Sequence, residues 1–113
     1  RLVGRLALAR FSNYWPDYGG LKCDADCDTL ASGADWRELL RWGTNVVACP
    51  AEFEFGTRLE WPVGSGLVWI CFDRGGAIVT AEDGAWFWLD FLMEYASVDY
   101  GAFIWVKVLE PQD

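Results

Sequence analysis

Apolar positions in this chain fall in short runs that are separated by glycine-containing turns. The run at 67–72 is apolar throughout, as a buried strand would be, and an acid, a base and two glycines follow it. Similar short runs recur along the sequence. They predict strands at 1–11, 45–48, 57–61, 67–72, 77–79, 86–92 and 102–109.

One segment has the spacing of a helix instead. Trp36, Leu39 and Leu40 would share one face of a short helix over 36–42. Asp35 directly precedes this segment and is placed to cap it. Many short strands with glycine turns and a single short helix predict a mainly β fold, a small β-barrel with long loops.

Length and charge narrow the possible functions. The 113 residues suffice for one domain, residues 1–113, with a core of its own, and the 53% apolar content argues against disorder. A net charge of −8 disfavours binding to nucleic acid or to an anionic membrane surface. The absence of histidine removes Ser-His-Asp triads and most zinc sites. We therefore expect no metal and no cofactor, and acid–base chemistry would use Asp, Glu, Tyr, Lys or Cys.

Four cysteines, Cys23, Cys27, Cys49 and Cys71, suit two disulfides in an oxidising compartment. Three pairings are possible, and the simplest joins Cys23 to Cys27 and Cys49 to Cys71. A zinc site of four thiolates is the competing interpretation, although Cys49 and Cys71 lie outside any CxxC knuckle. The expected disulfides predict an extracellular or cell-envelope protein. No apolar run is long enough to span a membrane, so we expect no membrane insertion.

Eight tryptophans are more than a small domain easily buries. They predict an exposed aromatic strip that would suit sugar rings or another protein subunit. The segment at 12–20 is predicted to be a loop that holds Tyr14, Trp15 and Tyr18. These three rings would form a stacking surface or pack onto the core, and both interpretations stay open.

The segment at 22–28 is the most acidic part of the chain, with Asp24, Asp26 and Asp28 at alternating positions. Such spacing resembles a calcium loop, but the glycine and the distal glutamate of an EF-hand are missing. A solvated loop held by a disulfide is the favoured interpretation.

The stretch Asp73, Arg74, Gly75, Gly76 stands where a core strand is predicted to break into a tight turn. Paired glycines would allow a positive φ and leave room for a ligand or a second chain segment. Asp73 is then either a turn aspartate that hydrogen-bonds the nearby backbone or a catalytic or binding carboxylate.

The order of several short motifs resembles the 3D domain, a small double-psi β-barrel family named for three aspartates. That family shares its barrel with expansins, rare-lipoprotein-A-like proteins and the lytic transglycosylase A group. The matching stretches are 29–33 (TLASG), 46–50 (VVACP), 55–59 (FGTRL), 73–78 (DRGGAI), 89–91 (LDF) and 100–101 (YG) with 106–108 (VKV). The resemblance implies a six-stranded double-psi β-barrel.

The same resemblance implies a secreted domain of lytic transglycosylase type that cleaves the glycan of peptidoglycan. Asp73 and Asp90 would act as acid and base, close together at one mouth of the barrel. One carboxyl group with a raised pKa suffices for such a reaction, and Arg74 would oppose that rise if it pointed inward. The candidate binding residues around them are Tyr14, Trp15, Tyr18, Thr57, Arg74, Gly75, Gly76 and Trp88.

One departure from the family pattern points to a different function. Cys49 stands where the family has its first aspartate, which the resemblance places near Asp73 and hence near Cys71. A disulfide between Cys49 and Cys71 would replace a carboxylate with a covalent link. The alternative is therefore a non-catalytic module, either a glycan binder or a structural subunit of an extracellular assembly, with cell-wall glycan or protein subunits as partners.

Overall fold

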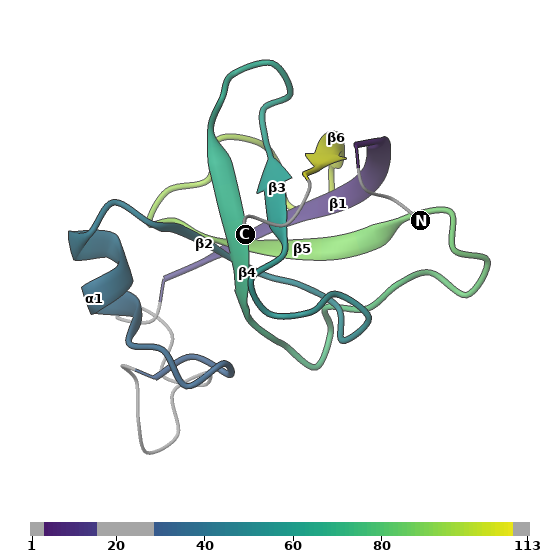
Figure 1. Ribbon diagram of the computed structural model, residues 1–113. Helices are drawn as coiled ribbons and strands as arrows, with labels where there is room; N and C mark the ends of the chain where they lie inside the picture. Colours follow the sequence, from purple (N-terminus) through teal and green to yellow (C-terminus); the bar gives the residue numbers. More distant parts are fainter. Residues whose placement is uncertain (1–3, 16–28, 110–113) are drawn as a thin grey trace.

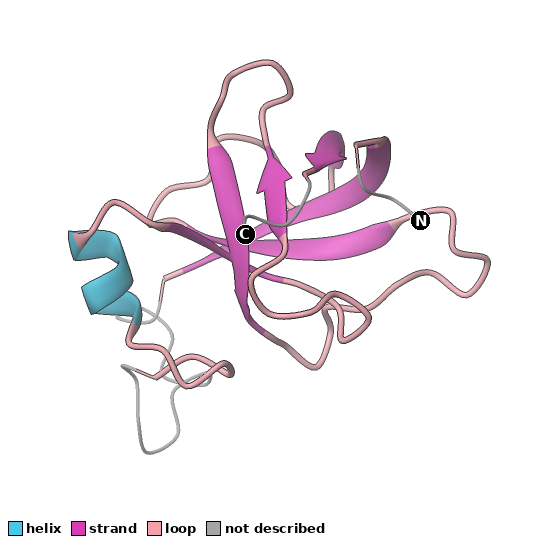
Figure 2. Cartoon of the chain, viewed as in Figure 1, coloured by secondary structure: helices cyan, strands magenta, loops and turns pink. Residues whose placement is uncertain are grey.

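The computed structural model describes residues 4–15 and 29–109. As expected, the fold is mainly β: a closed six-stranded barrel with a single short helix in the described residues, joined by long loops (Figure 2). The elements in chain order are β1 (Leu6–Tyr14), α1 (Trp36–Arg41), β2 (Asn45–Ala48), β3 (Arg58–Glu60), β4 (Val68–Asp73), β5 (Phe87–Leu92) and β6 (Phe103–Val108).

The strands close in the order β1-β5-β2-β4-β3-β6. Two neighbouring pairs are parallel, β1 with β5 and β2 with β4, and the other four pairs are antiparallel. The parallel pairs require connections that cross the barrel, because only antiparallel neighbours can be joined by a tight hairpin. Strands far apart in sequence therefore lie side by side, as Figure 1 shows for β1 and β5.

The barrel interior is filled by large apolar side chains. Phe11 stacks on Phe91 with ring centroids 5.2 Å apart, and Trp61 packs against both rings. The inward residues alternate with outward ones along each strand, as the two-residue period of a strand requires.

A second, smaller apolar cluster lies outside the barrel wall. Its buried members are Leu30, Trp36, Val46 and Leu92, which come from the segment around α1 and from the outer faces of β2 and β5. Figure 1 places α1 beside the end of β2. Asp35 caps this helix as predicted, because its carboxylate accepts hydrogen bonds from the backbone N–H groups of Arg37 and Glu38.

One predicted strand and one predicted strand end are wrong. The segment 77–79 forms no strand, because a turn closes where Ile78 N–H donates to the Gly75 carbonyl. The Ile78 side chain is nevertheless buried. The first strand extends to Tyr14 instead of ending at 11, since its pairing with β5 continues to Leu92. Residues 12–14, predicted as loop, therefore belong to the barrel.

Helix α1 has six residues. Within residues 4–15 and 29–109, no helix is long and apolar enough to cross a membrane.

Candidate functional site

The outer face of β1 holds the polar and aromatic side chains that are candidates for a functional site. Ala7, Ala9 and Phe11 point into the core, so the residues between them point outward. Arg10 and Tyr14 are therefore on the same outer face, about 13 Å apart along the strand.

At one end of this face Tyr14 meets a carboxylate. Its hydroxyl donates to Asp73 Oδ2 at 2.7 Å, and the backbone N–H of Ala31 donates to Asp73 Oδ1 at 2.8 Å. Asp73 is the last residue of β4, not a turn residue beyond the strand. Both of its oxygens therefore accept hydrogen bonds, and they join β4 to β1 and to the segment before α1.

The second predicted carboxylate is held in a comparable way. Asp90 is 8% exposed and points outward, because its neighbours Leu89 and Phe91 lie in the core. Ser12 Oγ lies 2.8 Å from Asp90 Oδ1, and the indole Nε1–H of Trp88 donates to Ser12 Oγ at 2.8 Å.

The sheet register relates the two carboxylates. Ala48 on β2 pairs with Asp73 on β4 and with Asp90 on β5. Two strand spacings of about 4.8 Å thus put their backbones roughly 10 Å apart. A close approach of the two carboxyl groups themselves stays a prediction.

Both carboxylates raise the pKa of the Tyr14 phenol. Burial is the main cause that raises the pKa of the Tyr14 phenol above its usual value, and the charge of Asp73, its hydrogen bond and the charge of Asp90 add to it. Tyr14 is therefore a protonated donor at neutral pH. A buried phenol beside two acids is the kind of perturbed group that functional sites contain.

The disulfide between Cys49 and Cys71 is confirmed, with a Cα–Cα distance of 5.7 Å. Both cysteines are fully buried in the barrel core. The backbone N–H of Cys49 also donates to the Asp73 carbonyl, so the link lies directly beside the strand end that carries Asp73. Residues Cys23 and Cys27 lie outside the described residues.

Arg74 points away from the carboxylate oxygens. Its guanidinium donates to the backbone carbonyls of Cys49, Asp73 and Phe53, and lies 4.0 Å from the centroid of the Phe55 ring. It therefore fixes the loop after β2 and does not pair with the Asp73 side chain.

The two glycines after Arg74 do not have the expected backbone. Neither Gly75 nor Gly76 has a positive φ. A Cβ at Gly75 would lie 2.8 Å from Ile78 Cγ1, whereas a Cβ at Gly76 would meet nothing within 4 Å. Gly75 is thus required by the packing of Ile78, and Gly76 lies in open space.

Other predicted binding residues have mainly local contacts. Thr57 Oγ1 donates to the Glu54 carbonyl within a turn. Trp15 packs edge-on against buried Trp36 with centroids 4.9 Å apart, so it extends the outer cluster. Tyr18 lies outside the described residues.

At the other end of the outer face, aromatic rings gather over β6, β1 and β5. Phe103 and Trp88 are the register partners of Arg10 on the two strands beside it. Trp86 and Tyr100 pack against this row, and Trp105 follows two residues after Phe103 on the same face. We call this set the aromatic platform: Arg10, Trp86, Trp88, Tyr100, Phe103 and Trp105.

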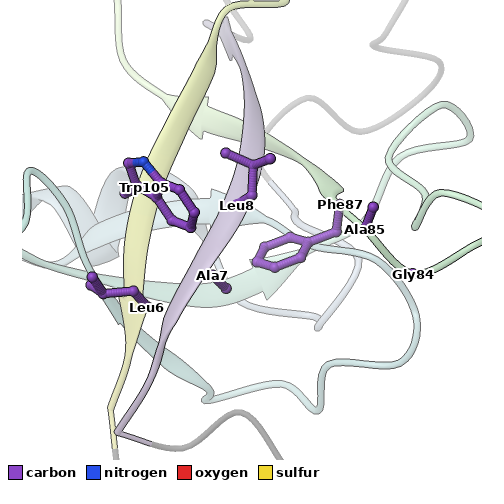
Figure 3. Close-up of a pocket in the computed structure, with 7 residues that line it drawn as sticks. All are labelled: Leu6, Ala7, Leu8, Gly84, Ala85, Phe87 and Trp105. Carbon is purple, nitrogen blue, oxygen red and sulfur yellow. The ribbon is translucent and has the colours of Figure 1, made fainter.

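The platform is open to solvent. Tyr100 is 79% exposed, Trp105 57% and Phe103 55%. A pocket of about 320 Å³ adjoins it and is lined by apolar side chains of β1 and β6 and by the turn before β5 (Figure 3). Trp105 belongs to both, so platform and pocket form one surface.

The sequence interpretation missed most of the platform. Trp88 was a candidate, but Arg10, Trp86, Tyr100, Phe103 and Trp105 were not. The alternation of Phe103, Trp105 and Lys107 with buried residues in β6 was a usable signal, since it marks a strand with aromatic residues on its outer face.

Among residues 4–15 and 29–109, no group of three His, Cys, Asp or Glu side chains is placed to hold a metal ion. No protein-family model, no curated protein and no solved structure matches this chain.

Proposed function

We propose that this chain is a non-catalytic, glycan-binding domain of the cell envelope or extracellular space. The observation that carries this proposal is the aromatic platform, in which rings from β5, β6 and the loops before them flank Arg10 of β1 on one outer face. Three of these rings, Tyr100, Phe103 and Trp105, are exposed. Flat aromatic faces stack on the apolar faces of sugar rings, and isolated domains rarely expose so many large rings together.

Charge and covalent chemistry favour the same class of ligand. The net charge of −8 disfavours polyanions such as nucleic acid. The Cys49–Cys71 disulfide suits an oxidising compartment, where cell-wall glycan is found. The resemblance to 3D domains, through the stretches at 73–78 and 89–91 among others, supports peptidoglycan as the glycan.

Two features favour binding over cleavage. A general acid must donate a proton to the leaving oxygen, but both oxygens of Asp73 already accept hydrogen bonds from Tyr14 and Ala31. The position of the family's first aspartate holds Cys49, which is buried and disulfide-bonded.

Sedimentation with purified, insoluble peptidoglycan tests the proposal. The wild-type chain should co-sediment, and Trp105→Ala should weaken binding about three- to tenfold, the size of one lost stacking contact. Trp42→Ala is the matched control, because Trp42 is 77% exposed but lies just after α1, away from the platform. Wild-type chain that stays in solution, or equal losses for both variants, would contradict the proposal.

Glycan cleavage is the second candidate function. Asp73 and Asp90 both raise the pKa of Tyr14, and the hydrogen bonds from Trp88 through Ser12 connect Asp90 to the platform. A glycan bound on the platform would extend towards these acids. Mass analysis of incubated peptidoglycan tests this candidate: anhydro-sugar products that disappear in Asp90→Asn would favour cleavage, and unchanged glycan would reject it.

A further inference from the structure

The aromatic platform has a cation at its centre. The guanidinium carbon of Arg10 lies 4.8 Å from the ring centroid of Trp88, 5.1 Å from that of Phe103 and 5.4 Å from that of Trp86. Arg10 Nε–H donates to the carbonyl of Gly101 at 3.0 Å. Three rings and one backbone carbonyl therefore fix the guanidinium in place.

Gly101 keeps room for this arrangement. A Cβ at residue 101 would lie 3.0 Å from Arg10 Nη2, and the residue has a positive φ of 79°. Glycine is thus favoured twice at this position, by its backbone conformation and by the side chain that it faces. The guanidinium is held in one orientation before any ligand arrives.

Arg10 has no acidic partner in the described parts of the chain, although the protein contains 17 acidic residues. Its single hydrogen bond there uses Nε, so the Nη1 and Nη2 groups form a fork without a protein acceptor. Such a fork matches the two oxygens of a carboxylate in a bidentate pair.

We propose that the platform binds a sugar that carries a carboxylate, such as a uronic acid or a sugar with a carboxylated ether substituent. The pyranose ring would stack on the exposed rings while its carboxylate pairs with the Arg10 fork. This inference rests on the proposed glycan-binding function and adds the chemical class of the glycan. The fixed cation supplies the charge complementarity that a purely aromatic surface lacks.

Two matched oligosaccharides test the inference by calorimetry: a hexamer of β-1,4-linked glucuronate and a hexamer of β-1,4-linked glucose. They differ only in the oxidation of C6. Salt at 0.15 M, where the screening length is about 8 Å, limits the repulsion between the acidic protein and the acidic sugar. The wild-type chain should bind the glucuronate hexamer about tenfold more tightly, as one charge-assisted pair predicts.

Arg10→Gln should abolish this preference, measured as the ratio of the affinities for the two hexamers within the same variant. Arg10→Lys keeps the charge but loses the planar fork, so it should retain only a part of the preference. Because the glucose hexamer reports the packing of the platform in each variant, a damaged platform is distinguished from a lost carboxylate contact.

Equal wild-type affinity for the two hexamers, or a preference that survives Arg10→Gln, would overturn the inference and leave the glycan-binding function in place. Failure of both hexamers and of insoluble peptidoglycan to bind would overturn that function as well. A dimer in sedimentation analysis that Trp105→Arg dissociates would assign the platform to a second copy of the chain and also overturn the inference.

Discussion

Tyr14 shows how one residue joins several parts of the barrel. It ends β1, packs on the outer apolar cluster, and donates a hydrogen bond to Asp73 at the end of β4. The raised pKa of its phenol follows from burial beside two negative charges. Its protonation therefore contributes to the stability of the fold, and this contribution depends on pH.

The raised pKa predicts alkaline destabilisation. Below pH 10 both the folded and the unfolded chain keep the Tyr14 proton. Above pH 10 the unfolded chain loses it while the folded chain retains it, so the free energy of unfolding should fall by up to about 1.4 kcal/mol per pH unit.

Tyr14→Phe should lower the free energy of unfolding at pH 7 by about 1.5–3 kcal/mol, through the lost hydrogen bond to a charged group, and should remove the alkaline fall. Urea unfolding between pH 7 and 11 measures both effects, with Tyr95→Phe as a control because Tyr95 is exposed. Curves for wild type and Tyr14→Phe that stay parallel above pH 10 would contradict this explanation.

Gly75 and Gly76 are adjacent and allow a matched comparison. Gly75→Ala places a methyl group 2.8 Å from Ile78 Cγ1 and should cost about 1–3 kcal/mol, as overpacking does. Gly76→Ala meets open space and should change stability by less than about 0.5 kcal/mol. Thermal and urea unfolding of the two variants compare these costs; similar values would show that packing against Ile78 does not explain Gly75.

At the scale of elements, the sequence predicted the approximate positions of the helix and of six strands, because the patterns that indicate them are local. The cap at Asp35 and the apolar runs that became β2, β4 and β5 can be recognised from a few neighbouring residues. The segment 77–79 was mistaken for a strand because its apolar residues indicate burial, and Ile78 is buried within a turn instead of a strand. β1 ends later than expected because β5 pairs with it, which no local pattern reveals.

The Cys49–Cys71 disulfide joins the end of β2 to the middle of β4, where the two strands run parallel. It closes a loop with a sequence separation of 22 residues, which the chain-entropy estimate values at about 3 kcal/mol. The double variant Cys49→Ala/Cys71→Ala should lose about that much stability in urea unfolding. A loss below about 1 kcal/mol would mean that the link contributes little beyond the packing of its neighbours.

At the scale of the whole molecule, the outer face of β1 and β5 runs from the aromatic platform to the end of the barrel that holds Asp73 and Asp90. The predicted carboxylates Asp73 and Asp90 and the ring of Trp88 all lie on or beside it. The sequence also predicted an exposed aromatic strip, but it did not place the strip. Arg10, Phe103 and Trp88 become neighbours only through the register of β6, β1 and β5, which depends on barrel closure.

The eight indole N–H groups give a direct map of where glycan binds. Nuclear magnetic resonance of the ¹⁵N-labelled chain, titrated with soluble peptidoglycan fragments, would follow each indole signal separately. Binding on the platform predicts the largest shifts for Trp105, Trp86 and Trp88, with little change for exposed Trp42 or for buried Trp69. Unshifted platform signals at saturating glycan, or shifts centred on Trp42, would contradict the proposal that this surface binds glycan.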